Sequence, residues 1–287
     1  MAIDFKRLTL LRKKLTAIAL KILTYILLVT LAFSMLIPFI WMVSTSFMND
    51  LEVYEYPPKL IPDKLNWKNY QEALTLLPFD RFFLNSIIIS AGVVTGQLII
   101  CSLAAFSFAR LHYRGRDKIF SVYLSTMMIP AIVTIIPSFL IIDTFRGLNS
   151  YWAMIVPFLN SVWGIFLLRQ FFLTLPKDLE DAARIDGASN WTIYWRIILP
   201  LSRPALATLG IFSFMASWKE FLWPLIVTSQ MEMRPVEVGI ALFHSIYITK
   251  WPYQMAAAVV VMLPILIVFF FTQRYFIRGI ALTGMKG

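Results

Sequence analysis

Residues 22–44 read ILTYILLVTLAFSMLIPFIWMVS, a run of 23 positions without a charged side chain. A helix needs about 20 mostly apolar residues to cross the hydrocarbon core of a bilayer, so this run predicts a membrane-spanning helix. It is too long for the apolar core of a signal peptide, and no A-x-A cleavage pattern follows it. We therefore expect the segment to remain in the protein as a membrane anchor.

Five further stretches of the 287-residue chain are apolar and long enough to span. They are residues 85–109, 119–142, 151–168, 205–228 and 255–273. The chain is 59% hydrophobic and 15% charged, with mean hydropathy +0.72, whereas soluble domains carry roughly 25% charged residues. The sequence therefore predicts an all-α integral membrane protein, a bundle of six transmembrane helices, rather than a soluble helical protein with a large core. Prolines within the spans predict bent helices.

Lysine and arginine are distributed unevenly between the predicted loops. If the N-terminus is cytoplasmic, 18 of the 26 basic residues lie in cytoplasmic segments, as the positive-inside rule expects. This predicts an even number of spans and two cytoplasmic termini. It also explains the +10 net charge without nucleic acid. The predicted organisation is a basic cytoplasmic N-terminus, residues 1–21, followed by one transmembrane domain, residues 22–287, whose longest cytoplasmic loop is 169–203.

The loop 169–203 reads as two short helices. Pro176 suits a first helical position, Gly187 suits a helix end and Ser189 suits the cap of a second helix. Acids that favour a helix N-terminus fill the first turn: Asp178, Glu180 and Asp181. Leu179, Ala182 and Ala183 share a face that suits the cleft of a partner protein. An amphipathic helix lying on the lipid surface is the alternative.

Residues 180–200, EDAARIDGASNWTIYWRIILP, resemble the signature of permease subunits of binding-protein-dependent ABC importers. That signature is EAA, three residues, G, nine residues, I, one residue, LP, and it falls here on Asp181-Ala182-Ala183, Gly187, Ile197 and Leu199-Pro200. Asp181 stands where the family usually has glutamate, and its side chain is one methylene shorter. If the family's acid contacts a basic residue of the ATPase, we expect that contact to be made differently here, with Glu180 as the alternative acid. Further stretches resemble the carbohydrate-type branch, the maltose and glycerol-phosphate group: FMASWKEFLWPLIV (214–227), RPVEVGIALF (234–243) and QRYFIRGIALTGMKG (273–287).

The resemblance implies a permease subunit that forms half of the pathway for a sugar or sugar-like solute in a bacterial or archaeal plasma (inner) membrane. The implied partners are an extracytoplasmic solute-binding protein, a second permease, expected to form a heterodimer, and two ABC ATPases that bind ATP and Mg. No cofactor or metal is expected in this chain, which has no G-x-x-x-x-G-K-[ST] loop. The implied ATPase-coupling residues are Glu180, Asp181, Ala182, Ala183, Asp186, Gly187, Ile197, Leu199 and Pro200. Lys286 and Gly287 form a second expected contact, with a disordered tail as the alternative.

Two groups of polar residues in the spans are candidates for the solute path. Lys219 and Glu220 are an ionisable pair inside an apolar stretch, which suggests function; alternatively they lie at the outer interface with Lys219 snorkelling. Asn160, Ser161 and Trp163 suit sugar hydroxyls, or they hold helices together. The outer segment 231–254 is expected to contact the binding protein or to serve as a connector.

Other functions fit the sequence less well. An ion-coupled secondary transporter of six helices should carry carboxylates in several spans, and here they are nearly absent. A membrane enzyme is disfavoured because His112, His244 and the single Cys101 form no metal-binding or catalytic pattern. A channel or scaffold is compatible with the predicted topology, and only the signature argues against it. The sequence leaves open which solute is carried and whether this chain or its partner permease binds it.

Overall fold

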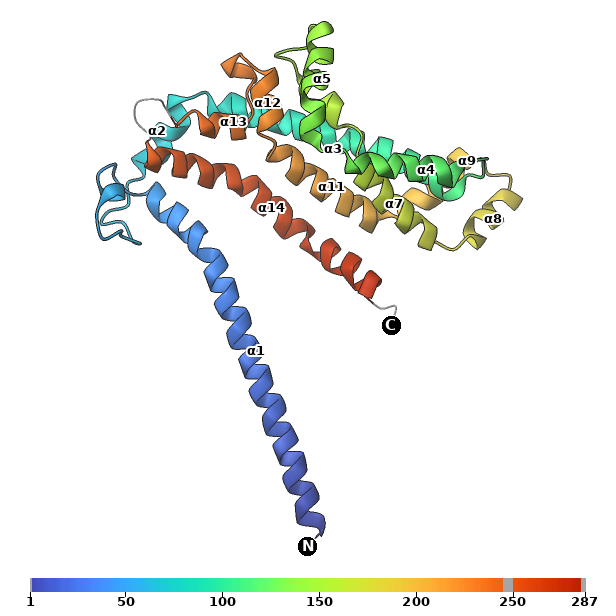
Figure 1. Cartoon of the computed structure of the whole chain (residues 1–287), viewed down its shortest axis with the longest axis horizontal. Coiled ribbons are helices and arrows are strands. Elements are labelled where there is room, and N and C mark those ends of the chain that lie inside the picture. Colours follow the sequence, from blue (N-terminus) through green and yellow to red (C-terminus); the bar gives the residue numbers. More distant parts are fainter. Residues whose placement is uncertain (1, 245–249, 285–287) are drawn as a thin grey trace. The chain divides into compact units, whose positions relative to one another are not determined.

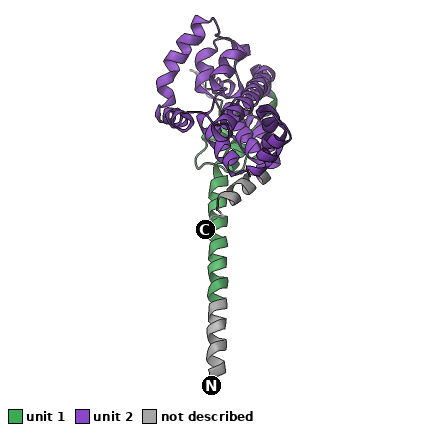
Figure 2. Ribbon diagram, turned by 90° about the vertical axis from the view of Figure 1, so that its right-hand side faces the viewer, with its two compact units in different colours: residues 1–71, 250–259 green, residues 72–249, 260–287 purple. Residues whose placement is uncertain are grey.

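The computed structural model describes residues 2–244 and 250–284, and the side chains of residues 15–244 and 250–273. The described residues form helices joined by loops, with no strand among them (Figure 1). They divide into two compact units, residues 1–71 with 250–259 and residues 72–249 with 260–287 (Figure 2). The predicted all-α class is confirmed.

In the first unit, helix α1 (Ala2–Ser46) contains the predicted first span. The stretch Leu15–Ser46 has the length and apolarity of a membrane span, and 0% of its most apolar window is buried within the chain. The helix extends back through the basic N-terminal residues as far as Ala2. Because no water-soluble protein exposes so long an apolar helix, lipid or another chain must cover it.

The loop that follows α1 is tightly hydrogen-bonded. The side-chain amide of Asn69, near the start of α2 (Lys68–Leu76), donates to the carbonyls of Ser46 at 2.9 Å and Met48 at 2.8 Å. After the short helical turn η1 (Glu52–Tyr54), the backbone N–H of Asp63 donates to the buried carboxylate of Glu52 at 2.7 Å. Lys59 in the same loop makes side-chain hydrogen bonds to Asp63 and Glu55, and these bonds, that to Asp63 first, raise the pKa of Lys59. These bonds give the loop a defined shape.

The second unit is organised around the long helix α3 (Phe79–Arg110), which packs against α7 (Val162–Thr174) and α11 (Arg203–Trp218). Helix α14 (Trp251–Gly284) is the last described helix, and its residues from Val260 onward belong to this unit. The shorter elements between them are α4 (Arg116–Ser125), η2 (Thr126–Met128), α5 (Ala131–Thr144), α6 (Tyr151–Ile155), η3 (Val156–Phe158), α12 (Leu222–Val227), η5 (Met231–Met233) and α13 (Val236–Ala241).

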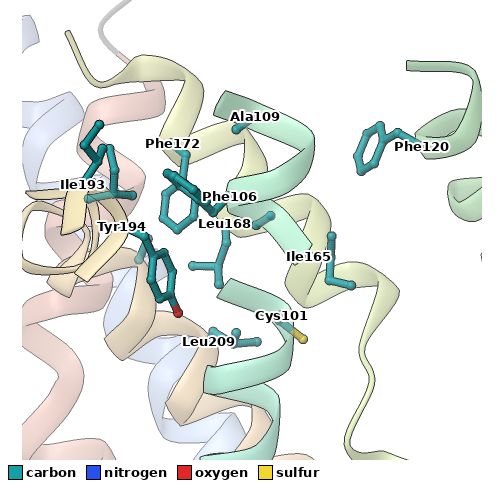
Figure 3. Packing of buried hydrophobic residues seen from close by; sticks show 13 residues of the cluster. Cys101, Phe106, Ala109, Phe120, Ile165, Leu168, Phe172, Ile193, Tyr194 and Leu209 are labelled. Carbon is teal, nitrogen blue, oxygen red and sulfur yellow. The ribbon is translucent and has the colours of Figure 1, made fainter. Parts of the chain in front are cut away.

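One apolar cluster joins α3, α7 and α11 to the loop 169–203 (Figure 3). Phe106 comes from α3, Leu168 and Phe172 from α7, and Ile193 and Tyr194 from the loop, and all of them are buried. The hydroxyl groups of Tyr194 and Ser102 lie 2.8 Å apart, which satisfies the polar end of the tyrosine inside the cluster. The loop is therefore packed against the helices through buried side chains.

Within the part of the chain that the structure describes, three helices are uninterrupted candidates for membrane spans: Leu15–Ser46, Phe79–Arg110 and Trp251–Gln273. Three more arise if each bent helix pair is one span. These pairs are Arg116–Met128 with Ala131–Thr144, bent by 97°, Tyr151–Phe158 with Val162–Thr174, bent by 45°, and Asn190–Leu201 with Arg203–Trp218, bent by 77°. The helices can thus make up to six spans, and the count of six stays a prediction.

The predicted continuous span 205–228 is broken in the structure. Helix α11 ends at Trp218, and α12 begins at Leu222. The physical reason is Pro224, whose ring would clash with the carbonyl of Glu220 in an unbroken helix. If the bent pair Asn190–Leu201 with Arg203–Trp218 is one span, the fifth candidate span begins at Asn190 rather than at residue 205.

Two glycines of the second unit provide a matched test of this packing. A Cβ atom on Gly164 would lie 2.8 Å from Cδ1 of Leu209 and 3.3 Å from the Sγ of Cys101, whereas one on Gly210 would meet nothing nearer than 3.9 Å. Both residues are helical, so alanine raises helix propensity at each. We expect Gly164→Ala to lower the unfolding free energy by about 1–3 kcal/mol through overpacking, and Gly210→Ala to leave it unchanged or higher. Thermal unfolding in detergent measures both, and equal shifts would contradict the packing described here.

Candidate functional site

The first short helix of the loop 169–203 is α8 (Asp178–Ile185), which begins two residues after the predicted start at Pro176. Gly187 has φ +80°, the left-handed conformation that glycine adopts without strain. Its N–H donates to the carbonyl of Arg184 at 3.0 Å, and the N–H of Ala188 donates to that of Ala183 at 2.9 Å. These two bonds form a Schellman motif. The predicted helix end at Gly187 is confirmed.

The second part of the loop begins with α9 (Asn190–Ile193), and its predicted cap is confirmed. The hydroxyl of Ser189 accepts a hydrogen bond from the backbone N–H of Thr192 at 3.2 Å. A π-helical turn, η4 (Tyr194–Ile198), and a short helix, α10 (Leu199–Leu201), follow. Sequence reasoning did not anticipate the π-helical turn, which is rare and concentrates at functional positions.

Helix α8 presents one face to its surroundings. Asp181, Ala182 and Asp186 are exposed, whereas Ala183 is half-buried and packs against the core. Ile185, which sequence reasoning missed, is 86% exposed and lies one turn beyond Ala182. The spacing of three residues between Ala182 and Ile185 was the available signal. A single exposed apolar side chain is not by itself a binding site, so a partner at Ile185 remains a prediction.

Glu180 has a different environment from its neighbours. It is buried, and its Oε1 lies 3.0 Å from the Nε of Arg110, the last residue of α3. In this structure Glu180 thus faces the chain's own helices, while Asp181 remains on the exposed face. An ATPase contact made by Glu180 stays a prediction.

The last three residues of the signature belong to the second part of the loop, Ile197 to η4 and Leu199 and Pro200 to α10. Ile197 and Leu199 are half-buried and pack against the same core as Ala183, and Pro200 is exposed. The signature therefore has two structural parts: an exposed helix ending at the Gly187 turn, and a packed segment that holds that helix to the bundle. Lys286 and Gly287 lie outside the described residues.

Each predicted solute-path residue of the group Asn160, Ser161 and Trp163 makes a contact with another residue of the same chain. Asn160 accepts a hydrogen bond from the hydroxyl of Tyr123 at 2.6 Å. Ser161 accepts one from the N–H of Gly164 at 3.1 Å and so caps α7. The ring of Trp163 packs edge-on against that of Phe212, with 5.1 Å between ring centroids. These contacts give the residues structural roles, and contact with a solute remains a prediction.

Lys219 and Glu220 lie at the break between α11 and α12. Lys219 is exposed at the C-terminal end of α11, where a cation is favourable. Glu220 accepts a hydrogen bond from the N–H of Trp223 at 3.1 Å and lines a cavity of about 90 Å³ with Gln97 and Ser213. Burial raises the pKa of nearby Glu237, and the charge of Lys219 acts in the opposite direction. Glu220 is thus the member of the pair that faces a cavity.

Two asparagines fix the segment after α12. The Oδ1 of Asn149 accepts hydrogen bonds from the N–H groups of Ser229 at 2.7 Å and Gln230 at 2.8 Å. The Nδ2 of Asn85, on α3, donates to the carbonyls of Glu232 at 2.7 Å and Arg234 at 3.0 Å. Residues 229–234 are therefore held in place on the second unit, as a rigid docking surface requires.

Asn149 offers a test of this arrangement because its φ of 57° is one that asparagine and glycine tolerate. Asn149→Gly keeps the backbone conformation and removes the acceptor of two N–H groups, so we expect a loss of about 1–3 kcal/mol of local stability. Hydrogen exchange at Ser229 and Gln230 should become faster by at least about fivefold. Asn149→Asp keeps the acceptor and serves as the control. Unchanged exchange in the glycine variant would mean that Asn149 does not hold the segment.

Comparison with known proteins adds a family to this geometry. Residues 97–282 match the family of binding-protein-dependent transport system inner membrane components. The chain is 33% identical over 241 residues to the sn-glycerol-3-phosphate transport system permease protein UgpE of Yersinia pestis bv. Antiqua, which covers 81% of this chain and 86% of that protein. It is 34% identical over 260 residues to the arabinooligosaccharides transport system permease protein AraQ of Halalkalibacterium halodurans. This alignment covers 90% of the present chain and 93% of AraQ.

Two of the solved structures that share the fold come from alginate transporters. One is a bacterial ABC transporter involved in the import of the acidic polysaccharide alginate, with a TM-score of 0.80, 24% identity and coverage of 89% of this chain and 95% of the other. The second is a bacterial alginate ABC transporter in complex with an alginate pentasaccharide-bound periplasmic protein, with a TM-score of 0.65, 13% identity and coverage of 88% and 92%. The helical arrangement described above is thus one already seen in membrane transporters.

Proposed function

The chain belongs to the family of binding-protein-dependent transport system inner membrane components, and from this premise we propose that it forms half of the pathway of an ATP-driven importer for a sugar or sugar-like solute. It is a multi-pass inner-membrane permease subunit, and hydrolysis of ATP belongs to a separate subunit. Family membership also disfavours the ion-coupled alternative.

The proposed solute class rests on the relatives. The similar permeases are named for sn-glycerol 3-phosphate and for arabinooligosaccharides, and the similar structures belong to alginate transporters. These solutes are all rich in hydroxyl groups and differ in charge and size. A polyhydroxylated solute is the class they share, and in this proposal Glu220, on the cavity with Gln97 and Ser213, accepts a hydrogen bond from a solute hydroxyl.

The proposed coupling surface is the exposed face of α8 together with the Gly187 turn. The observation that carries it is the exposed row Asp181, Ala182 and Ile185 at the edge of a packed loop. In this proposal the face enters a cleft of an ABC ATPase that binds ATP and Mg, in the manner of a helix in a groove. ATP-driven closure of two such ATPases then displaces α8 and switches the bundle between inward-facing and outward-facing states.

The remaining partners follow from the exposed surfaces. The apolar side of α1 needs lipid or a second permease to cover it, and a heterodimer of permeases is the proposed assembly. The fixed segment 229–234 is part of the proposed outer surface for an extracytoplasmic solute-binding protein. Six spans, with both termini in the cytoplasm, are the topology consistent with this arrangement.

Purification from native membranes tests the proposal. After mild detergent extraction of the tagged chain, we expect an ABC ATPase and a second permease to co-purify. The reconstituted complex should import a labelled polyhydroxylated solute only with both ATP and the binding protein present. Uptake driven by an ion gradient without an ATPase would overturn the proposal.

A further inference from the structure

A buried ion pair anchors α8 to the helix bundle. The side chains of Arg110 and Glu180 are 2% and 7% exposed, and the Nε of Arg110 lies 3.0 Å from the Oε1 of Glu180. The two residues are 70 positions apart, one at the end of α3 and the other in the first turn of α8. Two charges are removed from water here, which is costly unless geometry and further hydrogen bonds compensate.

Arg110 makes those further hydrogen bonds to a third element. Its Nη2 donates to the carbonyl of Phe172 and to that of Leu175, the latter at 2.8 Å. Phe172 lies in the last turn of α7, and Leu175 is its C-terminal cap. A cation at the C-terminal end of a helix is favoured by the unsatisfied carbonyls and the helix dipole. One guanidinium group thus connects the ends of α3 and α7 with the start of α8.

A second arginine makes the reciprocal connection. Arg169, on α7, donates from Nε to the carbonyl of Phe108 on α3 at 3.2 Å and from Nη2 to the Oδ1 of Asp117 at 3.0 Å. Its guanidinium also lies 4.2 Å from the ring centroid of Phe120. Helices α3 and α7 therefore each donate from an arginine to the terminal carbonyls of the other, and we call these two linked helix ends the base.

We propose that Arg110 and Glu180 are positioning residues that tie α8 to this base, so that α8, α3 and α7 move as one body. The inference rests on the proposed function, in which α8 receives the displacement from an ATPase. Helix α8 has only eight residues and an exposed outer face. The Nε of Arg110 and the Oε1 of Glu180 make a close ionic contact without the geometry of a hydrogen bond, and the attraction between these two buried charges holds the first turn of α8 against the end of α3. The tie turns movement of α8 into movement of α3 and α7.

The test separates this mechanical role from a purely stabilising one. The double variant Arg110→Met with Glu180→Leu replaces both charges by apolar groups of similar size, a change that often leaves stability unaffected. We expect it to reach the membrane and to retain the co-purifying ATPase, because the exposed face of α8 is unchanged. In the reconstituted importer, solute imported per ATP hydrolysed should fall at least tenfold. Hydrogen exchange in α8 should become faster, with that of α3 unchanged.

Asp117→Asn is the matched control. It also breaks an arginine–carboxylate pair of 3.0 Å, but Asp117 is 68% exposed, so the pair is screened by solvent. We expect the wild-type import ratio. If the double variant fails to fold, Glu180→Gln carries the test, since it removes only the charge and keeps an oxygen acceptor. A wild-type ratio of import to hydrolysis in the folded variant overturns the inference. Failure of the proposed function would show differently, as absence of an ATPase from the unmutated complex.

Discussion

Ile185→Asp is expected to abolish co-purification of the ATPase with the permease. Ile185 is 86% exposed at the end of α8, and in the proposed complex it becomes buried. Burial of an isoleucine side chain contributes about 1.5–3 kcal/mol, which corresponds to roughly 10- to 100-fold in affinity. An aspartate at the same place would bury a charge without a partner and weaken binding further. The measurement is the ATPase recovered per permease after detergent extraction, followed by titration of the purified subunits.

A conservative replacement controls for loss of folding. Ile185→Leu keeps an apolar group of equal size, so binding should stay within a fewfold of the unmutated protein. Because Ile185 is exposed, neither variant should alter thermal unfolding of the isolated chain by more than about 0.5 kcal/mol. Normal ATPase recovery with the aspartate variant would show that α8 does not dock through this side chain.

Gly187→Trp is expected to leave the protein in the membrane while uptake falls at least tenfold and ATP hydrolysis continues. The φ of +80° at Gly187 costs a side-chain-bearing residue roughly 1–2 kcal/mol. A Cβ there would meet nothing within 4 Å, so the bulk of the tryptophan projects outward, toward the proposed partner. Gly187→Asp should uncouple to a lesser degree. The measurement is the amount of solute taken up per ATP hydrolysed, with both rates determined on the same proteoliposomes.

Gly187→Asn separates the backbone from the surface. Asparagine tolerates the left-handed conformation and is small, so most of the uptake should survive. If the tryptophan variant transports as well as the asparagine variant, the turn has no part in coupling.

Features set by neighbouring residues were predictable from the sequence. The helix end at Gly187 and the cap at Ser189 depend on side chains and backbone bonds within a few positions, and both were confirmed. The class of the protein followed from the length and apolarity of its helices. The proline positions predicted bending, but not that α11 ends at Trp218, since a proline in a membrane helix produces either a kink or a break.

Features set by distant residues were not predictable. Arg110 and Glu180 each look like ordinary charges of a predicted cytoplasmic loop, and only the fold brings them within 3.0 Å. Ile185 was missed for a related reason. Its periodicity matches that of Ala182, but burial of the opposite side of α8 through Glu180 decides which face remains exposed. Asn160 was interpreted by residue type alone, and its partner Tyr123, 37 positions earlier in the chain, was not visible from the sequence. Ser161 caps α7 through the N–H of Gly164, which is a local signal that the interpretation overlooked.

Site-directed cross-linking in native membranes tests the coupling role of α8 most directly. The natural Cys101 is buried, so we expect a bulky reagent not to reach it, and single cysteines can be introduced elsewhere in the chain without removing it. A bifunctional maleimide should join the permease to the ATPase from Ile185→Cys and Ala182→Cys. It should not do so from Ile61→Cys, which is 80% exposed in the loop after α1. Absence of any ATPase cross-link from both α8 positions, in a protein that still imports its solute, would contradict the account.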